Sequence, residues 1–568
     1  MKGYILGISC GYHDSAAALI KDGKVLGAVE EERFTGIKHD SSFPINTINW
    51  LYKSNNIKGK DIEVVCFYDN PQKKLERISK STKRGPITDY FNRKEILRKN
   101  EELFKSFESQ MIDVTHKDVI ISYSDHHLSH AAYSYYTSPF DKATILSVDG
   151  VGEWETTTMY YGEKNKLTKI DSINFPHSLG MLYSTFTAFL GFKPNEGEYK
   201  VMGLAPYGNP TKFLSKFDSI ISPKKTGGFE INMKYFTYDW SDTHMFNEKL
   251  SELLGLPNRL PEEELTQDHK DLAATLQIIY ETYFLGLLDK LYLSKSTNNL
   301  CLSGGSAYNG TANGKILEKT NYKKLWIPPA PSDAGSAIGC ALHYYFTKGG
   351  IDRRDNNIPF LGPEYTQSEI KDILDSMSNK VYYVHKLDNQ LIPIIAKQIT
   401  EGLIVGWFQG RMEFGARALG NRSILANACD PQMRDRVNRV VKKREGFRPF
   451  APMVKLEEQT RFFDYKLEVP YMNQVVRVKE EHRKYLPAIT HVDGSARIQS
   501  VTNKQNRRIY QLLTELNKIN GYPIVLNTSF NLKDQTMVLD PKTAIETFLD
   551  CEMDTLVMGN FIVKKKIL

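Results

Sequence analysis

Cysteine is scarce in this sequence: there are six cysteines in 568 residues, and no two of them form a Cys-x-x-Cys pair. This scarcity excludes a disulfide framework and argues against a structural zinc site. No apolar run approaches the roughly 18 residues that a membrane-spanning helix needs. The N-terminal apolar stretch meets the polar residues Tyr12, His13 and Asp14 before it reaches the length of a signal peptide. We therefore expect a cytoplasmic protein with reduced thiols and no contact with a membrane.

A concentrated block of one charge sign is also missing. Lys and Arg number 74 and Asp and Glu number 67, which gives a net charge of +7. The densest basic run, Lys73–Arg84, has the pattern of a solvated helix and loop. Proteins that bind nucleic acids usually present a concentrated basic face, so we expect no nucleic acid partner. The content of 41% hydrophobic and 25% charged residues is typical of folded globular proteins.

The N-terminal half contains the same strand pattern twice. Apolar segments predict three consecutive strands at Tyr4–Ser9, Ser15–Ile20 and Val25–Glu30, joined by short turns. The pattern returns with strands at Thr144–Val148 and Glu155–Tyr161 and a further strand after the next turn. Two similar β-meanders predict an internally duplicated domain.

The end of this half has a helical pattern. Apolar residues at helical spacing predict a long buried helix over Leu272–Leu293, followed by a short strand at Leu300–Leu302. The run Ala334–Phe346, rich in Ala and Gly, predicts a closely packed helix with Ser332 or Asp333 as its N-cap.

A polar segment rich in Gly, Asp, Asn and Pro, Lys348–Pro363, is the best candidate for a linker, and we place the domain boundary near residue 362. Beyond it, apolar strands at Leu403–Trp407 and Ile524–Leu526 enclose a region rich in arginine. These arginines stand at positions 411, 417, 422, 434, 436, 439, 444 and 448. Guanidinium groups suit phosphate, which favours a phosphate ligand, with surface ion pairing as the alternative.

Two histidines and two aspartates form a candidate metal site. His126 and His130 are four residues apart in a predicted helix, so their side chains lie on one face. Asp149 follows a predicted strand, and Asp333 begins a predicted helix. Two imidazoles and two carboxylates suit Fe²⁺, Mn²⁺ or Zn²⁺. In the alternative interpretation, the histidines pack or cap and the aspartates serve turns or helix ends.

A glycine-rich turn follows the strand at Leu300–Leu302. In Ser303-Gly304-Gly305-Ser306, two residues without Cβ let backbone N–H groups come close to a nucleotide. The turns at Gly7–Ser15 and Asp149–Gly152 supply two further loops of this kind. The sequence contains no P-loop and no Rossmann signature.

Eight motifs, in order along the whole chain, carry a resemblance to a known family. They are Gly11–Ala17, Glu31-Glu32-Arg33 with Lys38-His39-Asp40, the His126–His130 block, Val148-Asp149-Gly150, Glu198–Ala205, Ser303-Gly304-Gly305, the Arg417 and Arg448 blocks, and the Asn527 block. With these motifs the chain resembles the ATP-dependent O-carbamoyltransferases of natural-product biosynthesis, such as the nodulation-factor, cephamycin and tobramycin enzymes.

The resemblance implies an α/β protein of two domains. Residues 1–362 would form a duplicated ASKHA-type (actin- and hexokinase-like) domain that binds a metal and transfers the carbamoyl group. Residues 363–568 would form a YrdC-like domain that makes carbamoyl adenylate from ATP and carbamoyl phosphate. The substrates implied are ATP with Mg²⁺, carbamoyl phosphate and a small-molecule hydroxyl acceptor, and a homodimer is compatible with the family.

The resemblance also assigns roles to individual residues. In the C-terminal domain, carbamoyl phosphate would be held by Arg417, Arg448, Arg497 and Asn527. The ATP phosphates would be steered by Lys442, Arg444, Ser529 and Asn531. In the N-terminal domain, the nucleotide would lie near Gly150, Lys200, Gly304, Gly305 and Asn309. Fe²⁺ or another divalent transition metal would be bound by His126, His130, Asp149 and Asp333. Catalytic roles would fall to His13, Lys38 and Lys442.

Three other functions stay open at this point. Fused domains of this kind also occur in enzymes that add threonylcarbamoyl to tRNA, but the missing basic face argues against RNA. Hydrogenase-maturation carbamoyltransferases share these modules, but they carry zinc fingers that this chain lacks. The third alternative is a nucleotide-sensing module without chemistry. The acceptor is not readable: the aromatic-rich segment Ser219–Met245 either lines an acceptor cleft or forms a surface hairpin.

Overall fold

A computed structural model describes residues 3–81, 90–241, 243–351, 356, 359–443 and 446–566. The chain forms two compact units: Met1–Glu31 with Ser41–Asn357, and Glu32–Asp40 with Ile358–Leu568. The sequence analysis places the boundary near residue 362, and no local pattern marks the short segment Glu32–Asp40 as part of the second unit. Among the described residues, no helix has both the length and the apolar character needed to cross a membrane.

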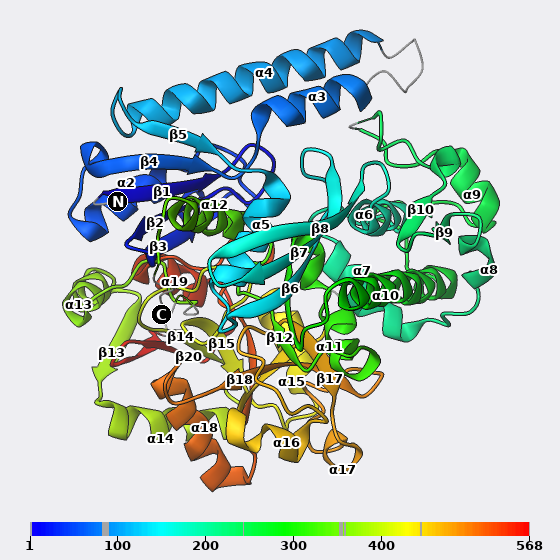
Figure 1. Cartoon of the computed structure of the whole chain (residues 1–568). Helices are drawn as coiled ribbons and strands as arrows, with labels where there is room; N and C mark the ends of the chain where they lie inside the picture. Colours follow the sequence, from blue (N-terminus) through cyan, green and yellow to red (C-terminus); the bar gives the residue numbers. More distant parts are fainter. Residues whose placement is uncertain are drawn as a thin grey trace. The chain divides into compact units, whose positions relative to one another are not determined.

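The first unit begins with a five-stranded sheet in the order β3-β2-β1-β4-β5 (Figure 1). Its strands are β1 (Tyr4–Ser9), β2 (Ala16–Lys21), β3 (Lys24–Glu30), β4 (Ile62–Phe67) and β5 (Ile120–Tyr123). The first three strands are antiparallel, with Gly7 opposite Ala18, and β1, β4 and β5 are parallel.

A second five-stranded sheet repeats this topology in the order β12-β11-β6-β7-β8. Its strands are β6 (Lys142–Val148), β7 (Glu155–Glu163), β8 (Lys166–Asn174), β11 (Asn299–Ser303) and β12 (Lys324–Trp326). Again the first three are antiparallel and the last two are added in parallel. The predicted duplication and the ASKHA-type fold class are therefore confirmed.

The last helix of each repeat lies at the centre of this unit. Helix α5 (His126–Tyr136) follows β5, helix α12 (Asp333–Thr347) follows β12, and the two pack against each other. Small residues allow the close approach: a Cβ at Gly339 would stand 1.9 Å from the backbone oxygen of Ser129, and a Cβ at Gly335 would stand 2.3 Å from the ring of Tyr133, and both of these partners are on α5. This close approach explains the tight packing that the sequence predicts for α12.

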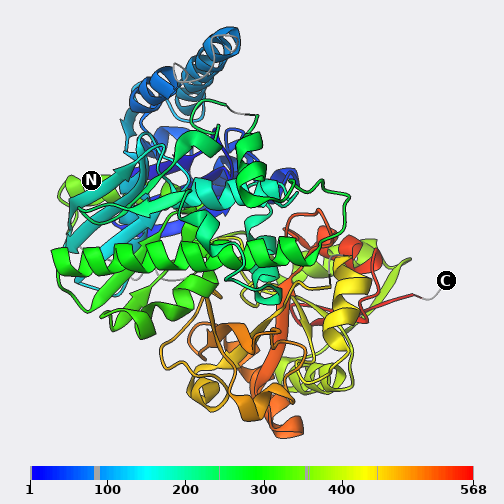
Figure 2. The ribbon, with the colours of Figure 1, turned by 90° about the vertical axis from the view of Figure 1, so that its right-hand side faces the viewer.

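The remaining elements surround the two sheets. The predicted long helix is α10, visible as the long green helix in Figure 2. The other described helices and the small hairpin are α2 (Ile45–Asn55), α3 (Pro71–Ser81), α4 (Tyr90–Asp113), α6 (Leu179–Phe189), α7 (Glu198–Leu204), α8 (Leu214–Phe217), α9 (Glu248–Leu254), α10 (Gln267–Ser294), α11 (Gly310–Lys319), β9 (Ile221–Pro223) and β10 (Phe229–Ile231).

The hairpin lies in the aromatic-rich segment Ser219–Met245, and Phe229 and Phe236 are buried there, so these aromatic rings belong to the core. Of the basic run Lys73–Arg84, residues up to Ser81 are described, and most of them form α3.

The second unit is built on one nine-stranded mixed sheet. Its strands, in spatial order, are β13 (Val381–His385), β21 (Phe561–Lys565), β20 (Thr555–Met558), β14 (Val405–Phe408), β15 (Arg422–Ala426), β19 (Ile524–Ser529), β16 (Ala451–Lys455), β18 (Ser495–Val501) and β17 (Gln474–Arg477). Its helices are α13 (Gln367–Ser376), α14 (Asp388–Thr400), α15 (Met433–Val437), α16 (Gln459–Phe462), α17 (Glu480–Arg483), α18 (Arg507–Asn520) and α19 (Pro541–Leu549). The segment Glu32–Asp40 contributes α1 (Glu32–Thr35).

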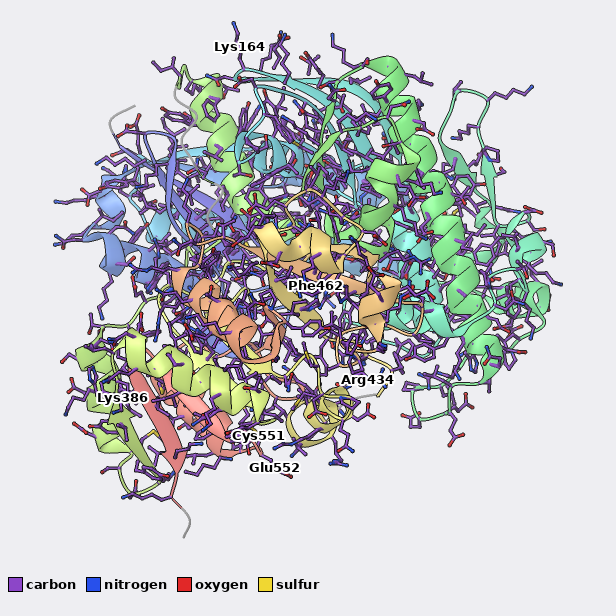
Figure 3. The ribbon with its side chains drawn as sticks, turned by 90° about the horizontal axis from the view of Figure 1, so that it is seen from below. Lys164, Lys386, Arg434, Phe462, Cys551 and Glu552 are labelled. Atoms are coloured by element: carbon purple, nitrogen blue, oxygen red, sulfur yellow. The ribbon has the colours of Figure 1, made fainter. Side chains whose placement is uncertain are left out.

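Both faces of this sheet are covered. Neighbouring residues of a strand point to opposite faces, and accordingly Trp407 packs with α14 and α18 while Phe408 packs with α13 and α19. Phe462 and Cys551, labelled in Figure 3, belong to the larger of the two cores. Burial on both faces explains why the central strands read as continuous apolar runs.

Candidate functional site

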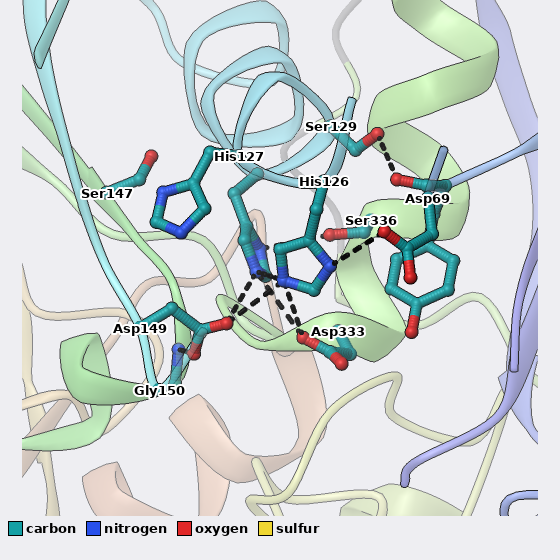
Figure 4. Close-up of polar contacts among 12 residues, drawn as sticks. Asp69, His126, His127, Ser129, Ser147, Asp149, Gly150, Asp333 and Ser336 are labelled. Atoms are coloured by element: carbon teal, nitrogen blue, oxygen red, sulfur yellow. Dashed lines mark hydrogen bonds and ion pairs between the residues drawn. The ribbon is translucent and has the colours of Figure 1, made fainter. Parts of the chain in front are cut away.

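The structure brings the four predicted metal ligands together in the first unit (Figure 4). His126 Nε2 lies 3.0 Å from Asp149 Oδ2 and 3.5 Å from Asp333 Oδ1. His130 Nε2 lies 3.1 Å from His126 Nε2, 3.5 Å from Asp149 Oδ2 and 3.4 Å from Asp333 Oδ1. All four residues are buried. Two nitrogen and two oxygen donors thus converge on one point.

Local structure explains this convergence. His126 and His130 are one turn apart on α5, so both rings lie on the face that meets α12. Asp333 is the first residue of α12. Asp149 follows β6 directly, and one of its oxygens, Oδ1, accepts a hydrogen bond from the Gly305 N–H at 2.9 Å. Its other oxygen remains directed at the histidines.

The charges within the cluster are strongly coupled. Burial alone would raise the pKa of Asp149, but hydrogen bonds from His126 and His130 hold it well below its usual value. The pKa of Asp333 is also lowered, because the charges of His126 and His13 outweigh burial. Burial would lower the pKa of His130, but the nearby carboxylates of Asp149 and Asp333 raise it to about 9. The site therefore holds two carboxylates whose negative charges favour a bound cation.

The residues present fit a transition-metal ion. A buried set of two imidazoles and two carboxylates is a borderline donor set, and Asp333 Oδ1 is buried without a hydrogen-bond partner. The other ring nitrogen of His130, Nδ1, lies 3.0 Å from Ser336 Oγ. Such an outer contact fixes the tautomer that leaves Nε2 free to bind a metal.

His13 lies beside this cluster. Its Nε2 is 4.0 Å from Asp333 Oδ2, and its Nδ1 is 2.9 Å from Asp14 Oδ2. Burial alone would lower the pKa of His13, but the charges of Asp333 and Asp14 raise it to about 9. The side chain keeps 20% of its surface exposed, so it is open to a ligand. Lys38 is a half-buried turn residue of the segment Glu32–Asp40, which belongs to the second unit.

The glycine turn packs closely against the protein's own backbone. Gly304 has φ +85°, and a Cβ there would stand 2.2 Å from the backbone oxygen of Val148. Its N–H donates to the Pro331 carbonyl at 2.8 Å, and the Gly305 N–H is taken by Asp149. Both N–H groups are thus bonded within the protein, and the nucleotide role of Gly304 and Gly305 stays a prediction.

The other predicted nucleotide residues of the first unit have structural contacts. The Asn309 side chain accepts from the Ala312 N–H at 3.1 Å, which caps α11, and it pairs with Gln277. Lys200 is half-buried on α7, with Nζ 5.6 Å from the centre of the Phe192 ring. Gly150 accepts a hydrogen bond from Ser178 through its carbonyl at 2.7 Å.

In the second unit the structure brings Lys442, Ser529 and Asn531 together. Lys442 Nζ donates to the Ser529 carbonyl at 2.6 Å and to Asn531 Oδ1 at 2.6 Å, and Ser529 Oγ donates to Asn531 Oδ1 at 2.7 Å. Lys442 is 5% exposed and ends a π-helical turn, and Ser529 ends β19. Arg444, the remaining predicted member, lies outside the described residues.

The predicted carbamoyl phosphate residues come from adjacent strands of the nine-stranded sheet. Asn527 lies on β19, Arg448 precedes β16, and Arg497 lies on β18. Asn527 Nδ2 donates to the Ala418 carbonyl at 2.8 Å, next to Arg417, while its Oδ1 is buried without a hydrogen-bond partner. The three arginines are half-buried.

Other arginines of this region serve the fold instead. Arg422 is fully buried, donates to the carbonyls of Gln409 and Pro363, and stacks on Phe408 with 3.7 Å between the guanidinium carbon and the ring centre. Arg411 donates to the carbonyl of Leu361 at 2.5 Å. Backbone oxygens accept most of the hydrogen bonds that these two guanidinium groups donate, while Arg422 Nε is buried without a partner, and a phosphate contact of these two residues stays a prediction.

Two acidic residues beside the metal cluster escaped the sequence analysis. Asp69 stands two residues after β4, and its Oδ1 lies 3.9 Å from His126 Nδ1. Glu153 accepts from the His126 N–H at 2.9 Å, and burial together with the Asp69 charge raises its pKa to about 9. The position of Asp69 after a strand was the available signal, the same one that marked Asp149.

Comparison with known proteins decides the family. The family model described as Carbamoyltransferase N-terminus matches residues 4–342, and the one described as Carbamoyltransferase C-terminus matches residues 396–565. The chain belongs to the carbamoyltransferase family. The recognition made from the eight motifs is thereby confirmed.

Two relatives illustrate the breadth of this carbamoyltransferase family. The uncharacterized protein sll1178 of Synechocystis sp. is 41% identical, over 99% of this chain and 97% of its own. Nodulation protein NolNO of Sinorhizobium fredii is 34% identical, over 98% of this chain and 79% of its own. Among solved structures, component A of the (R)-2-hydroxyglutaryl-CoA dehydratase of Acidaminococcus fermentans is similar at 14% identity and a TM-score of 0.34, covering 61% of this chain and 98% of its own.

Proposed function

We propose that this carbamoyltransferase is an ATP-dependent O-carbamoyltransferase that acts through carbamoyl adenylate. The observation that carries the proposal is the presence of two separate polar clusters in one chain of this family. One is the His126, His130, Asp149 and Asp333 cluster of the first unit. The other is the Lys442, Ser529 and Asn531 cluster of the second unit. Two chemical steps need two such sites.

The second unit would make the activated intermediate. Carbamoyl phosphate, ATP and one water would give carbamoyl adenylate, phosphate and pyrophosphate. Lys442, held by Ser529 and Asn531, would direct its ammonium group at the ATP phosphates, accompanied by Mg²⁺. Arg417, Arg448 and Arg497 would hold carbamoyl phosphate, because positioned cations stabilise the negative charge of transferring groups.

The first unit would transfer the carbamoyl group from carbamoyl adenylate to a hydroxyl of a small-molecule acceptor. The acceptor oxygen would bond to the carbamoyl carbon, the bond from that carbon to the adenylate oxygen would break, and AMP would leave. His126, His130, Asp149 and Asp333 would hold Fe²⁺ or a similar ion, which supplies a Lewis acid toward the carbamoyl oxygen when bound. At neutral pH a pKa of about 9 keeps His13 protonated, so it would stabilise charge beside Asp333. In its neutral form it would accept the proton of the attacking hydroxyl. The adenosine would lie near the turn at Gly304 and Gly305, as the family resemblance implies. Relatives named nodulation proteins support an acceptor of the natural-product class.

The first half-reaction can be tested without an acceptor. Purified protein would receive ATP, Mg²⁺ and carbamoyl phosphate, and pyrophosphate release and AMP formation would be followed. We expect release that depends on carbamoyl phosphate and is abolished by Lys442→Ala. The exposed Lys533, close in sequence to Asn531, supplies the matched control: Lys533→Ala should keep the wild-type rate.

The contrary results are equally clear. Release that does not require carbamoyl phosphate, or that responds only to threonine and bicarbonate, would contradict the proposal in favour of threonylcarbamoyl chemistry. Binding of ATP without any turnover would favour a nucleotide-sensing module.

A further inference from the structure

We infer that Asp69 is a positioning residue for the metal ligand His126, an inference that rests on the metal site of the proposed function. Each of the two residues has one buried atom without a hydrogen-bond partner: Asp69 Oδ1 and His126 Nδ1. These two atoms face each other at 3.9 Å (Figure 4). Asp69 is 1% exposed and His126 is 2% exposed. Bulk solvent does not reach either atom.

The missing contact is one that metal-bound histidines need. A histidine that binds a metal through Nε2 donates its Nδ1–H to a carboxylate, a carbonyl or a water. His130 has such a partner in Ser336, at 3.0 Å. For His126, the atom that Nδ1 faces is the carboxylate oxygen of Asp69. A movement of His126 Nδ1 by about 1 Å toward Asp69 Oδ1 would bring the two atoms to hydrogen-bond distance.

The surroundings hold Asp69 in the required orientation. Its other oxygen, Oδ2, pairs with the Lys74 ammonium group, so Oδ1 stays directed at the ring. Glu153 fixes the start of α5 from the same side, because it accepts from the N–H groups of Asn70 at 2.8 Å and of His126 at 2.9 Å. The backbone and the ring of His126 are thus both anchored to the segment that follows β4.

The contact has a definite chemical effect. A carboxylate at Nδ1 keeps the proton on that nitrogen, so the lone pair of Nε2 is directed at the metal. The negative charge also makes the imidazole a stronger donor. Asp69 touches neither substrate nor reacting atoms and acts only through His126.

Co²⁺ binding tests the inference without relying on activity. Co²⁺ affinity would be measured by competition with a chelating dye, and the site would be monitored by visible absorption. We expect Asp69→Ala to bind Co²⁺ about 10 to 100 times more weakly, with a shifted absorption band. Asp69→Asn should lie between that variant and the wild type, because its amide oxygen still accepts a hydrogen bond. Asp271→Asn, at a buried carboxylate bonded to Asn209 and Gln267, is the matched control and should match the wild type.

Each result decides a different point. If Asp69→Ala and Asp69→Asn both show wild-type affinity and spectrum, Asp69 does not position His126. If Asp69→Ala does not fold, the comparison of Asp69→Asn with Asp271→Asn decides alone. If the wild type and His130→Ala bind Co²⁺ equally, the metal site of the proposed function is wrong, and this inference falls with it.

Discussion

At the scale of single residues, Asp149 shows how one side chain serves two purposes. Its Oδ1 accepts from the Gly305 N–H at 2.9 Å, which fixes the carboxylate plane. Its Oδ2 faces both histidines. The glycine turn after β11 therefore orients a metal ligand, and this gives Gly305 a purpose besides making room for a nucleotide.

A substitution of His13 should affect the transfer half-reaction and leave the adenylate-forming half-reaction unchanged. We expect His13→Asn to leave pyrophosphate release unchanged and to slow carbamoyl transfer by about 10² to 10⁴-fold, the usual contribution of a positioned acid or base. Both rates would be measured with ATP, carbamoyl phosphate and an accepted hydroxyl compound. His244→Asn, at an exposed histidine, is the control. Equal loss of both rates in His13→Asn would contradict the assignment.

His491 makes stability depend on pH. Burial lowers its pKa from 6.5 to about 4, an effect that nearby Asp493 opposes and Arg497 and Arg434 reinforce. The unfolded chain binds a proton on this histidine below pH 6.5 and the folded chain does not. Its contribution is therefore complete above pH 6.5 and lost as the pH falls toward 4, on the order of 3 kcal/mol in total.

Denaturation midpoints between pH 4 and 7 check this expectation. His491→Gln should flatten the pH dependence in that interval, whereas His385→Gln, at an exposed histidine, should not. If the denaturation midpoint of His491→Gln changes with pH as it does in the wild type, the His491 ring is not the source of the pH dependence.

How far sequence predicts the site depends on what each residue contacts. The cluster of His126, His130, Asp149 and Asp333 was predictable because helix spacing and strand ends are local features. Arg422 and Arg411 were not, because a sequence does not show which backbone carbonyls fold onto a guanidinium group. For Asp69 the strand end was a local signal, but its partner His126 is distant in the sequence and could not be predicted.

At the scale of elements, the contact between α5 and α12 determines the metal site, since α5 carries both histidines and α12 carries Asp333. We expect Gly339→Ala to force the helices apart, because its Cβ would stand 1.9 Å from the Ser129 oxygen. The cost should be about 1 to 3 kcal/mol of stability, together with weaker metal binding.

Gly286 is the matched control for this substitution. It lies exposed in α10, and a Cβ there would meet nothing within 4 Å. Gly286→Ala should therefore stabilise the protein by about 0.5 to 1 kcal/mol. Thermal unfolding and Co²⁺ titration of both variants measure the two effects. Destabilisation of similar size in both would show that close packing of α12 is not the cause.

The elements themselves were largely predictable, and their partners were not. The meanders of the two repeats follow from alternating short apolar segments and turns, and both appear as β1 to β3 and β6 to β8. The nine-stranded order of the second unit joins strands far apart in sequence, such as β13 with β21. No local pattern predicts such pairings.

At the scale of the whole molecule, the two units should lose activity separately. A chelator with nitrogen donors, which prefers transition metals to Mg²⁺, should abolish carbamoyl transfer and leave pyrophosphate release intact. Adding back Fe²⁺, Mn²⁺ or Zn²⁺ one at a time would show which ion restores transfer. Loss of pyrophosphate release under the same treatment would contradict the assignment of one half-reaction to each unit.

The repeated strand order of the first unit also bears on ancestry. Two identical halves would place the same residue at the start of both closing helices, yet α5 begins with His126 and α12 with Asp333. The loop after β6 holds Asp149, whereas the loop after β1 holds Cys10 at the corresponding place. One half now contributes imidazoles and the other carboxylates. If the two repeats descend from one duplicated ancestor, this mixed donor set took its present form only after the two copies diverged.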